Sequence, residues 1–217
     1  LSKIHNTIHQ AYQSLTTEKI QIKPRVLYVL ATKTGGTPQT NQDLMGALAD
    51  MIETYTLFAN AKKMDLHLYQ NNEYALVESY ILNDAINIFP HRSEEYDRAI
   101  SNWLIKHNFE LIHIRHLAWH SLGLVDCAKA LGIPVIFSLH DFYTVCPTVK
   151  LLDAEQRDCA GKCTDGPLDC SYDLWRDKTF PPLKNAAVWD WRRKFELIFL
   201  KCDYFVTTNE SAKSIIL

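Results

Sequence analysis

The side chains best suited to chemistry in this sequence follow short apolar runs. His140 and Asp141 come directly after the apolar run 135–139, and Arg115 and His116 close the preceding run in the same way. An imidazole can donate or accept a hydrogen bond at a ligand hydroxyl, and a neighbouring carboxylate can orient the ring or bind a hydroxyl itself. These residues predict a ligand site where two strands end.

Each of these polar residues also has a structural interpretation. His140 could be a histidine whose nitrogens are satisfied inside the fold, and Asp141 could cap a turn. His113 and Arg115 lie on one face of a strand by period-two alternation, so either could be buried packing or the partner of a carboxylate. His116 is a candidate ligand contact or a solvated side chain. The residues alone leave these alternatives open.

A pair of glycines, Gly35 and Gly36, follows the first apolar run, and Pro38 begins a helix beyond them. Glycines let the backbone approach a ligand closely, and the amino terminus of a helix attracts phosphate. A tight turn between a strand and a helix has the same composition. On spacing alone, a phosphate-binding loop and a structural turn both remain open.

Four of the six cysteines, Cys146, Cys159, Cys163 and Cys170, fall in the stretch 146–182, which is rich in Gly, Asp and Pro. We predict a long excursion there instead of regular structure. The spacing of 12, 3 and 6 residues between the cysteines could supply the thiolates of a structural zinc site. Reduced thiols and a disulfide are the alternatives, because this is not the spacing of a standard zinc ribbon.

The elements that must position these groups alternate along the chain. Hydrophobic patterns predict strands at 25–31, 53–59, 66–69, 74–81, 111–115, 135–139 and 204–207, and helices at 38–51, 94–107, 117–131, 183–201 and from 211. This alternation predicts an α/β fold, a Rossmann-like doubly wound sheet that is mostly parallel, with right-handed crossovers. Ser93 is the expected cap of the helix at 94–107.

Ligands of such sheets bind at the carboxyl edge of the strands. Four polar clusters are expected there: Gly35 and Gly36, His116 and His120, His140 and Asp141, and Asn209 and Glu210. The sequence therefore predicts a small-molecule site at this edge.

Length and charge restrict the classes of function. The 217 residues, 47% of them hydrophobic, suffice for one large domain, and the formal net charge of -2 gives no overall attraction to nucleic acid. No apolar stretch spans a bilayer and the amino end lacks the core of a signal peptide, so a cytoplasmic location is expected. We predict a helical extension at 1–23 and a domain at 24–217, and Leu1 in first place favours a piece of a longer polypeptide.

The helix predicted at 183–201 combines aromatic and basic residues. Trp189, Trp191 and Phe195, with the basic residues between them, could contact the inner face of a membrane peripherally. The spacing of Val188, Trp191 and Phe195 fits a core-facing stripe, which is the interpretation we favour.

Several stretches together resemble the amino-terminal domain of family 4 glycosyltransferases. They are a first strand followed by Gly-Gly, then Leu-Ile-His-Ile-Arg-His-Leu, then Gly-Ile-Pro-Val-Ile-Phe-Ser-Leu-His-Asp-Phe-Tyr with Cys-Pro and Leu-Leu-Asp after it, and a late Cys-Asp-Tyr-Phe-Val-Thr-Thr-Asn-Glu. The resemblance covers 25–217, and 133–153 is its most specific part. It implies the GT-B architecture of two Rossmann-like domains, of which the first holds the acceptor.

The resemblance implies a retaining transferase that uses a nucleotide-sugar donor and a glycan or lipid-linked acceptor in polysaccharide biosynthesis. Gly35 and Gly36 would face the donor diphosphate. His140 would line the reaction centre with a positioning and charge-stabilising role, while Arg115, His116 and Asp141 would contact substrate. No metal is required for transfer in this architecture. The donor half, with its Glu-x7-Glu motif, has no counterpart here, so the isolated chain should turn over poorly.

Two other classes remain as alternatives. A GT-B sugar-nucleotide epimerase would need a catalytic set of carboxylates, which the sequence does not reveal. A non-enzymatic Rossmann-like binding module would use the cysteine loop as a zinc-stapled structural element. A second domain with Glu-x7-Glu would favour the transferase over the binding module.

Overall fold

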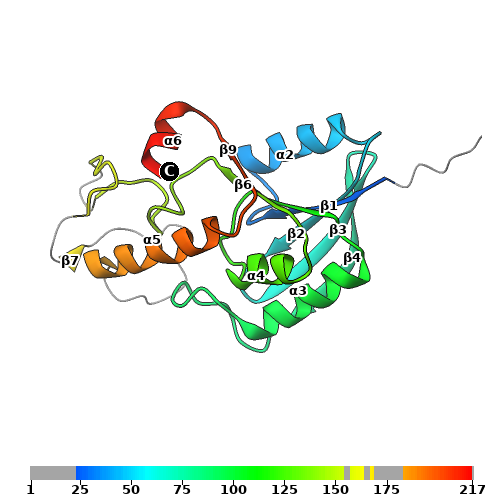
Figure 1. The fold of residues 1–217 in the computed structure, drawn as a ribbon, viewed down its shortest axis with the longest axis horizontal. Helices are drawn as coiled ribbons and strands as arrows, with labels where there is room; N and C mark the ends of the chain where they lie inside the picture. Colours follow the sequence, from blue (N-terminus) through cyan, green and yellow to red (C-terminus); the bar gives the residue numbers. More distant parts are fainter. Residues whose placement is uncertain (1–22, 154–156, 164–166, 169–182, 217) are drawn as a thin grey trace, which may run out of the picture.

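The computed structural model describes residues 23–153, 157–163, 167–168 and 183–216. Its centre is a seven-stranded sheet in the order β4-β3-β2-β1-β5-β6-β9 (Figure 1). The strands are β1 (Arg25–Leu30), β2 (Glu53–Ala59), β3 (Lys63–Gln70), β4 (Glu73–Ile81), β5 (Leu111–Ile114), β6 (Val135–Leu139) and β9 (Tyr204–Thr207), with a separate antiparallel pair β7 (Pro167–Leu168) and β8 (Leu183–Lys184). The helices are α2 (Gly36–Ala47), α3 (Glu94–Lys106), α4 (Gly123–Ala130), α5 (Asn185–Phe199) and α6 (Glu210–Ile216).

The expected mostly parallel α/β sheet is confirmed. Strands β2, β1, β5, β6 and β9 pair in parallel, and β3 and β4 add an antiparallel hairpin at one edge. Asn71 and Asn72 form the hairpin turn with φ angles of 53° and 63°. Asn tolerates these left-handed angles better than most residues, which is why a two-residue loop suffices.

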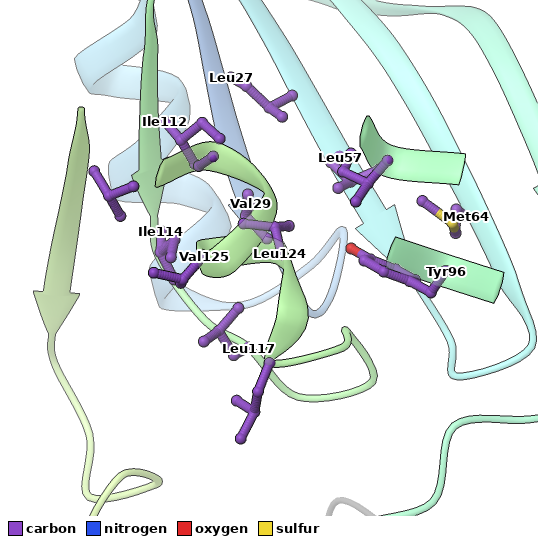
Figure 2. Close-up of a cluster of buried hydrophobic side chains, with 14 of the residues drawn as sticks. Leu27, Val29, Leu57, Met64, Tyr96, Ile112, Ile114, Leu117, Leu124 and Val125 are labelled. Carbon is purple, nitrogen blue, oxygen red and sulfur yellow. The ribbon is translucent and has the colours of Figure 1, made fainter. Parts of the chain in front are cut away.

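Helices cover both faces of the sheet, α2 on one side and α3 and α4 on the other (Figure 1). The larger core lies under α3, α4 and α5 and includes Leu27, Leu57, Ile112 and Ile114 (Figure 2). A smaller core joins α2 to the opposite face through Met45. Alternate residues of each strand therefore enter different cores, as the two-residue period of a strand requires.

The helix α3 follows its sequence signals closely. Ser93 accepts a hydrogen bond from the amide of Tyr96 at 3.2 Å, so the predicted cap is confirmed. Acidic residues occupy the first turn and Lys106 the last, which complements the helix dipole.

The helix predicted at 117–131 is wrong at its start, because α4 begins only at Gly123. His120 enters the core instead: its Nε2 donates to the carbonyl of Leu30 at 2.8 Å and its Nδ1 accepts from the Tyr96 hydroxyl at 2.7 Å. Ser121 accepts from the Gly123 amide at 3.1 Å. These bonds hold the segment against the end of β1, where a continuous helix could not reach.

The core interpretation of the stripe on α5 is confirmed. Val188, Trp191, Phe195 and Ile198 are at most 1% exposed, whereas Trp189 is 60% exposed with the guanidinium of Arg192 over its ring. Within the described part of the chain, no helix combines the length and apolar character that crossing a membrane would need. The predicted helical extension at 1–23 lies outside the described residues except for Lys23.

Candidate functional site

A cavity of about 190 Å³ opens at the carboxyl edge of the sheet, where the chain leaves β1 on one side and β5 on the other. This is the topological switch point at which open α/β sheets bind ligands. Its lining is Leu30, Ala31, Thr32, Thr34, Gly35, Gly36, Thr37, Pro38, His116, Asp141 and Val149. The structure thus brings together four predicted site residues, the two glycines with His116 and Asp141.

The Gly35–Gly36 loop presents bare backbone to this cavity. Gly35 has a φ of 116° and a ψ of -178°, a conformation that is essentially restricted to glycine. A Cβ on Gly36 would meet nothing within 4 Å, so the space above it is open. The first turn of α2 has no side-chain cap and no acidic residue, which leaves its N–H groups available to an anionic ligand.

His116 holds Asp141 in place on the opposite wall. The Ala118 amide donates to His116 Nδ1 at 2.9 Å, which requires the ring proton to be on Nε2 in the neutral ring. His116 Nε2 then donates to Asp141 Oδ2 at 3.1 Å, and the Tyr143 amide donates to Oδ1 at 2.9 Å. These two hydrogen bonds orient both carboxylate oxygens. Asp141 can therefore cap the turn at Tyr143 and still accept a hydrogen bond from a ligand.

The carboxylate of Asp141 stays ionised in this setting. Burial alone would raise its pKa, but the hydrogen bonds from His116 and from the Tyr143 amide outweigh that effect. Its pKa lies below the ordinary value as a result. The cavity wall therefore carries one oriented negative charge.

His140 lies beside this wall but does not line the cavity. Its Nε2 is 3.5 Å from Asp141 Oδ2, and neither ring nitrogen has a hydrogen-bond partner among the described residues. Burial lowers the pKa of His140 to about 4, although the carboxylate of Asp141 acts in the opposite direction. The ring is neutral at pH 7, with one donor and one acceptor unused.

Arg115 lies on the α2 side of the sheet, next to the cavity but not in its lining. Its Nη1 donates to Ser138 Oγ at 3.2 Å and its Nη2 to Thr40 Oγ1 at 3.0 Å. Because Ser138 accepts this bond, its own hydroxyl proton is available to His113 Nε2 at 2.8 Å. The predicted shared face of His113 and Arg115 is confirmed, and His113 is the structural member of the pair.

Two of the expected polar clusters have structural roles. His120 is fully buried, and burial lowers its pKa to about 4. Asn209 accepts from the Ala212 amide at 2.8 Å, which caps α6, and Glu210 pairs with Lys213. Of these two clusters, His116 lines the cavity, whereas His120, Asn209 and Glu210 do not.

The cysteine loop is described only in part. Cys146, Cys159 and Cys163 pack in one apolar cluster, and Cys170 lies outside the described residues. Cys146 Sγ lies 3.2 Å from Thr148 Oγ1, and Cys159 donates to a backbone carbonyl. No group of three or more His, Cys, Asp or Glu side chains within the described ranges could hold a metal ion, so the four-cysteine zinc site stays a prediction.

Sequence reasoning missed part of the cavity wall. Val149, in the loop after Cys146, lines the cavity and has a φ of 71°, which is strained for a β-branched residue. The sequence signal nearest to Val149 was the Leu-Leu-Asp stretch just beyond it. That stretch identified the loop but did not indicate that the loop returns to the cavity. Thr40 on α2 and Ser138 on β6, the partners of Arg115, carried no signal because their role depends on the fold bringing both within reach of the guanidinium.

The sequence matches the family described as Glycosyltransferase Family 4 over residues 34–217. No curated protein matches it. Among solved structures, a secreted C11 cysteine protease from Bacteroides thetaiotaomicron, "iotapain", is similar with 10% sequence identity and a TM-score of 0.37. That similarity covers 54% of this chain and 45% of the protease, and it is too low to carry an argument about fold or activity.

Proposed function

Because the chain belongs to glycosyltransferase family 4, we propose that it is the acceptor-side domain of a retaining transferase. The enzyme would move a hexosyl group from a nucleotide sugar to a glycan or lipid-linked acceptor. The observation that carries the proposal is the cavity in which the Gly35–Gly36 loop faces His116 and Asp141. A second Rossmann-like domain would hold most of the donor.

The glycine loop would receive the donor diphosphate. Free N–H groups at the start of α2 stabilise negative charge, and that charge grows as the bond between the sugar and the phosphate breaks. Donors fixed in place before the reaction need no reorganisation when the charge develops. Gly35 and Gly36 thereby assist departure of the nucleotide.

Asp141 and His140 would position the reacting sugars. The ionised carboxylate of Asp141 can accept a hydrogen bond from a sugar hydroxyl, and His116 prevents it from turning away. The neutral ring of His140 can donate to one hydroxyl and accept from another. Neither is assigned as a nucleophile: in the proposed front-face reaction the leaving phosphate takes the acceptor proton.

Nucleotide release from a panel of sugar nucleotides tests this proposal, in a protein that joins this chain to its donor-binding domain. We expect one donor to support release, and His140→Ala to lower turnover roughly 100-fold with unchanged folding. Gly36→Val should raise the donor KM, because its side chain would occupy the open space above the loop. Near wild-type turnover of His140→Ala would exclude the assigned role of His140.

The epimerase alternative has little support at this cavity. Asp141 is the one carboxylate among the described residues that line it, whereas the epimerase would need a set of carboxylates. A binding module remains the outcome if a well-folded protein releases no nucleotide with any donor and acceptor tested.

A further inference from the structure

Arg115, a cation at the carboxyl edge, has no acidic partner among the described residues. Arg115 donates to the neutral hydroxyls of Ser138 and Thr40, and its Nε is buried without any partner in the described part of the chain. A guanidinium has five N–H groups, so three remain after these two hydrogen bonds. Burial lowers the pKa of Arg115, and the described group that acts against this shift is Tyr28, not a carboxylate.

Other arginines among the described residues have charged or carbonyl partners. Arg25 pairs with Glu53 at 3.1 Å and Arg92 with Asp126 at 2.7 Å. The partly buried Arg192 donates to the backbone carbonyls of Val145 and Gly161. Burial of a charged group is unfavourable unless an opposite charge compensates it. The half-buried guanidinium of Arg115 differs from these, because the described residues give it only two neutral hydroxyls and leave its Nε without a partner.

The groups around Arg115 cannot supply the missing charge. His113 is neutral at pH 7, since burial lowers its pKa to about 4, and His140 is neutral for the same reason. Asp141 lines a small pocket together with Arg115, but its carboxylate is held by His116 and the Tyr143 amide. Among the described residues, no other group supplies a compensating negative charge to Arg115.

We propose that Arg115 binds an oxyanion, the phosphate or carboxylate of the acceptor substrate, at the edge of the cavity. Thr40 fixes one side of the guanidinium from α2 and Ser138 fixes the other from β6, so the remaining N–H groups are preorganised. Assignment of the anion to the acceptor rests on the proposed function.

Position separates this subsite from the donor phosphates. Arg115 does not line the cavity that the Gly35–Gly36 loop faces. Thr40, which holds it, lies about one helical turn beyond Gly36 on α2, roughly 5–6 Å along the axis. A donor diphosphate bound at the glycine loop would therefore not occupy Arg115, which stays available to a second ligand.

Titration of the ¹⁵N-labelled protein with methyl phosphate and, separately, with acetate tests the subsite by NMR at pH 7.5 and constant ionic strength. We expect one of the two to shift the side-chain signals of Arg115 and His140, and Arg115→Gln to weaken its binding about tenfold or more. The ligand that binds identifies the oxyanion as phosphate or carboxylate. Arg98→Gln, which removes an exposed arginine on α3, should leave binding within twofold.

Unchanged binding by Arg115→Gln would overturn the proposal, and so would shifts confined to the amides of 35–37. If circular dichroism shows that Arg115→Gln folds poorly, Thr40→Val replaces it. This variant removes one hydrogen bond that orients the guanidinium and should weaken binding about threefold.

The two proposals fail separately. Anion binding through Arg115 without any nucleotide release would reject only the transferase, whereas normal release without such binding would reject only the subsite.

Discussion

Alternate residues of β5 and β6 lie in two different environments. Ile112 and Ile114 point into the core under α3 to α5, where they are fully buried among apolar side chains (Figure 2). His113 and Ser138 point to the α2 side, where they hydrogen-bond one another and Ser138 also accepts from Arg115. The same strands therefore build an apolar side and a polar side, and the α2 side is where the cavity opens.

The two sides of the sheet differ in how fully their buried polar atoms are hydrogen-bonded within the described part of the chain. On the α3 side the core is apolar and the buried His120 has partners at both ring nitrogens, although Oδ1 of Asp97 has none among the described residues. On the α2 side, several buried atoms have no partner in the described part of the chain: Nε of Arg115, both nitrogens of His140 and both amide atoms of the fully buried Asn41. Natural folds leave few such atoms, and a ligand that completes the structure is one explanation for them.

The largest expected effect is loss of stability in acid. Burial lowers the pKa of His91 to about 3 and those of His113, His120 and His140 to about 4, against an ordinary value of 6.5. Between these values the unfolded chain binds protons that the folded chain excludes, so stability is complete above pH 6.5 and falls as pH decreases toward 4. Urea denaturation should show a loss of about 1.4 kcal/mol per pH unit for each neutral histidine.

The loss of stability in acid tests whether histidines on both sides of the sheet contribute to the pH dependence of the free energy of unfolding. His91 and His120 lie on the apolar side, and His113 and His140 on the polar side. His113→Gln should reduce the number of protons taken up on unfolding by one, so that the free energy of unfolding depends less steeply on pH but still depends on it. A stability that is flat between pH 6.5 and 4.5 would contradict the prediction.

Next in size is truncation of the largest buried side chain on the apolar side. Trp191 is fully buried, its Nε1 donates to the Tyr143 carbonyl at 2.6 Å, and its ring stacks on His91. Trp191→Ala should lower the free energy of unfolding by about 3–5 kcal/mol. The matched control Trp189→Ala, at an exposed position of the same helix, should cost less than about 1 kcal/mol. Equal losses in the two variants would reject the buried stripe of α5.

Neighbouring residues give the most direct contrast between the two sides. Ile114→Ala should lower the free energy of unfolding by about 2–5 kcal/mol, because it opens a cavity in the larger core. Arg115→Met, one residue later, should change it by less than about 1 kcal/mol, since the charge it removes has no acidic partner. Chemical denaturation of both variants measures this, and a large loss in Arg115→Met would assign that residue a structural role.

Among the variants expected to destabilise the fold, the smallest loss is expected at the glycine loop. Gly35→Ala places a side chain on a backbone with a φ of 116° and should cost about 1–3 kcal/mol. Gly36→Ala is the matched control, because its Cβ would meet nothing and its backbone is helical. A melting temperature equally lowered in both variants would show that strain at Gly35 is not the cause.

Sequence patterns predicted the order of elements well and the loops poorly. Period-two apolar runs identified the core strands, and the cap at Ser93 identified the start of α3. The helix expected from 117 failed because His120 and Ser121 form long-range hydrogen bonds that no local pattern encodes. For the site, grouping at one sheet edge was predictable, but which residues line the cavity was not.

By itself, the sequence determined the α/β class, the polar residues that end each parallel strand, and membership of glycosyltransferase family 4. Those properties follow from local periodicity and from short motifs, which survive without knowledge of packing. Only the tertiary structure decided that His116 orients Asp141, that His140 lies beside the cavity and that Arg115 lacks a counter-charge. Hydrogen-bond partners and burial depend on which strand ends and helix turns meet in space, because partners such as Arg115 and Thr40 are 75 residues apart in the chain.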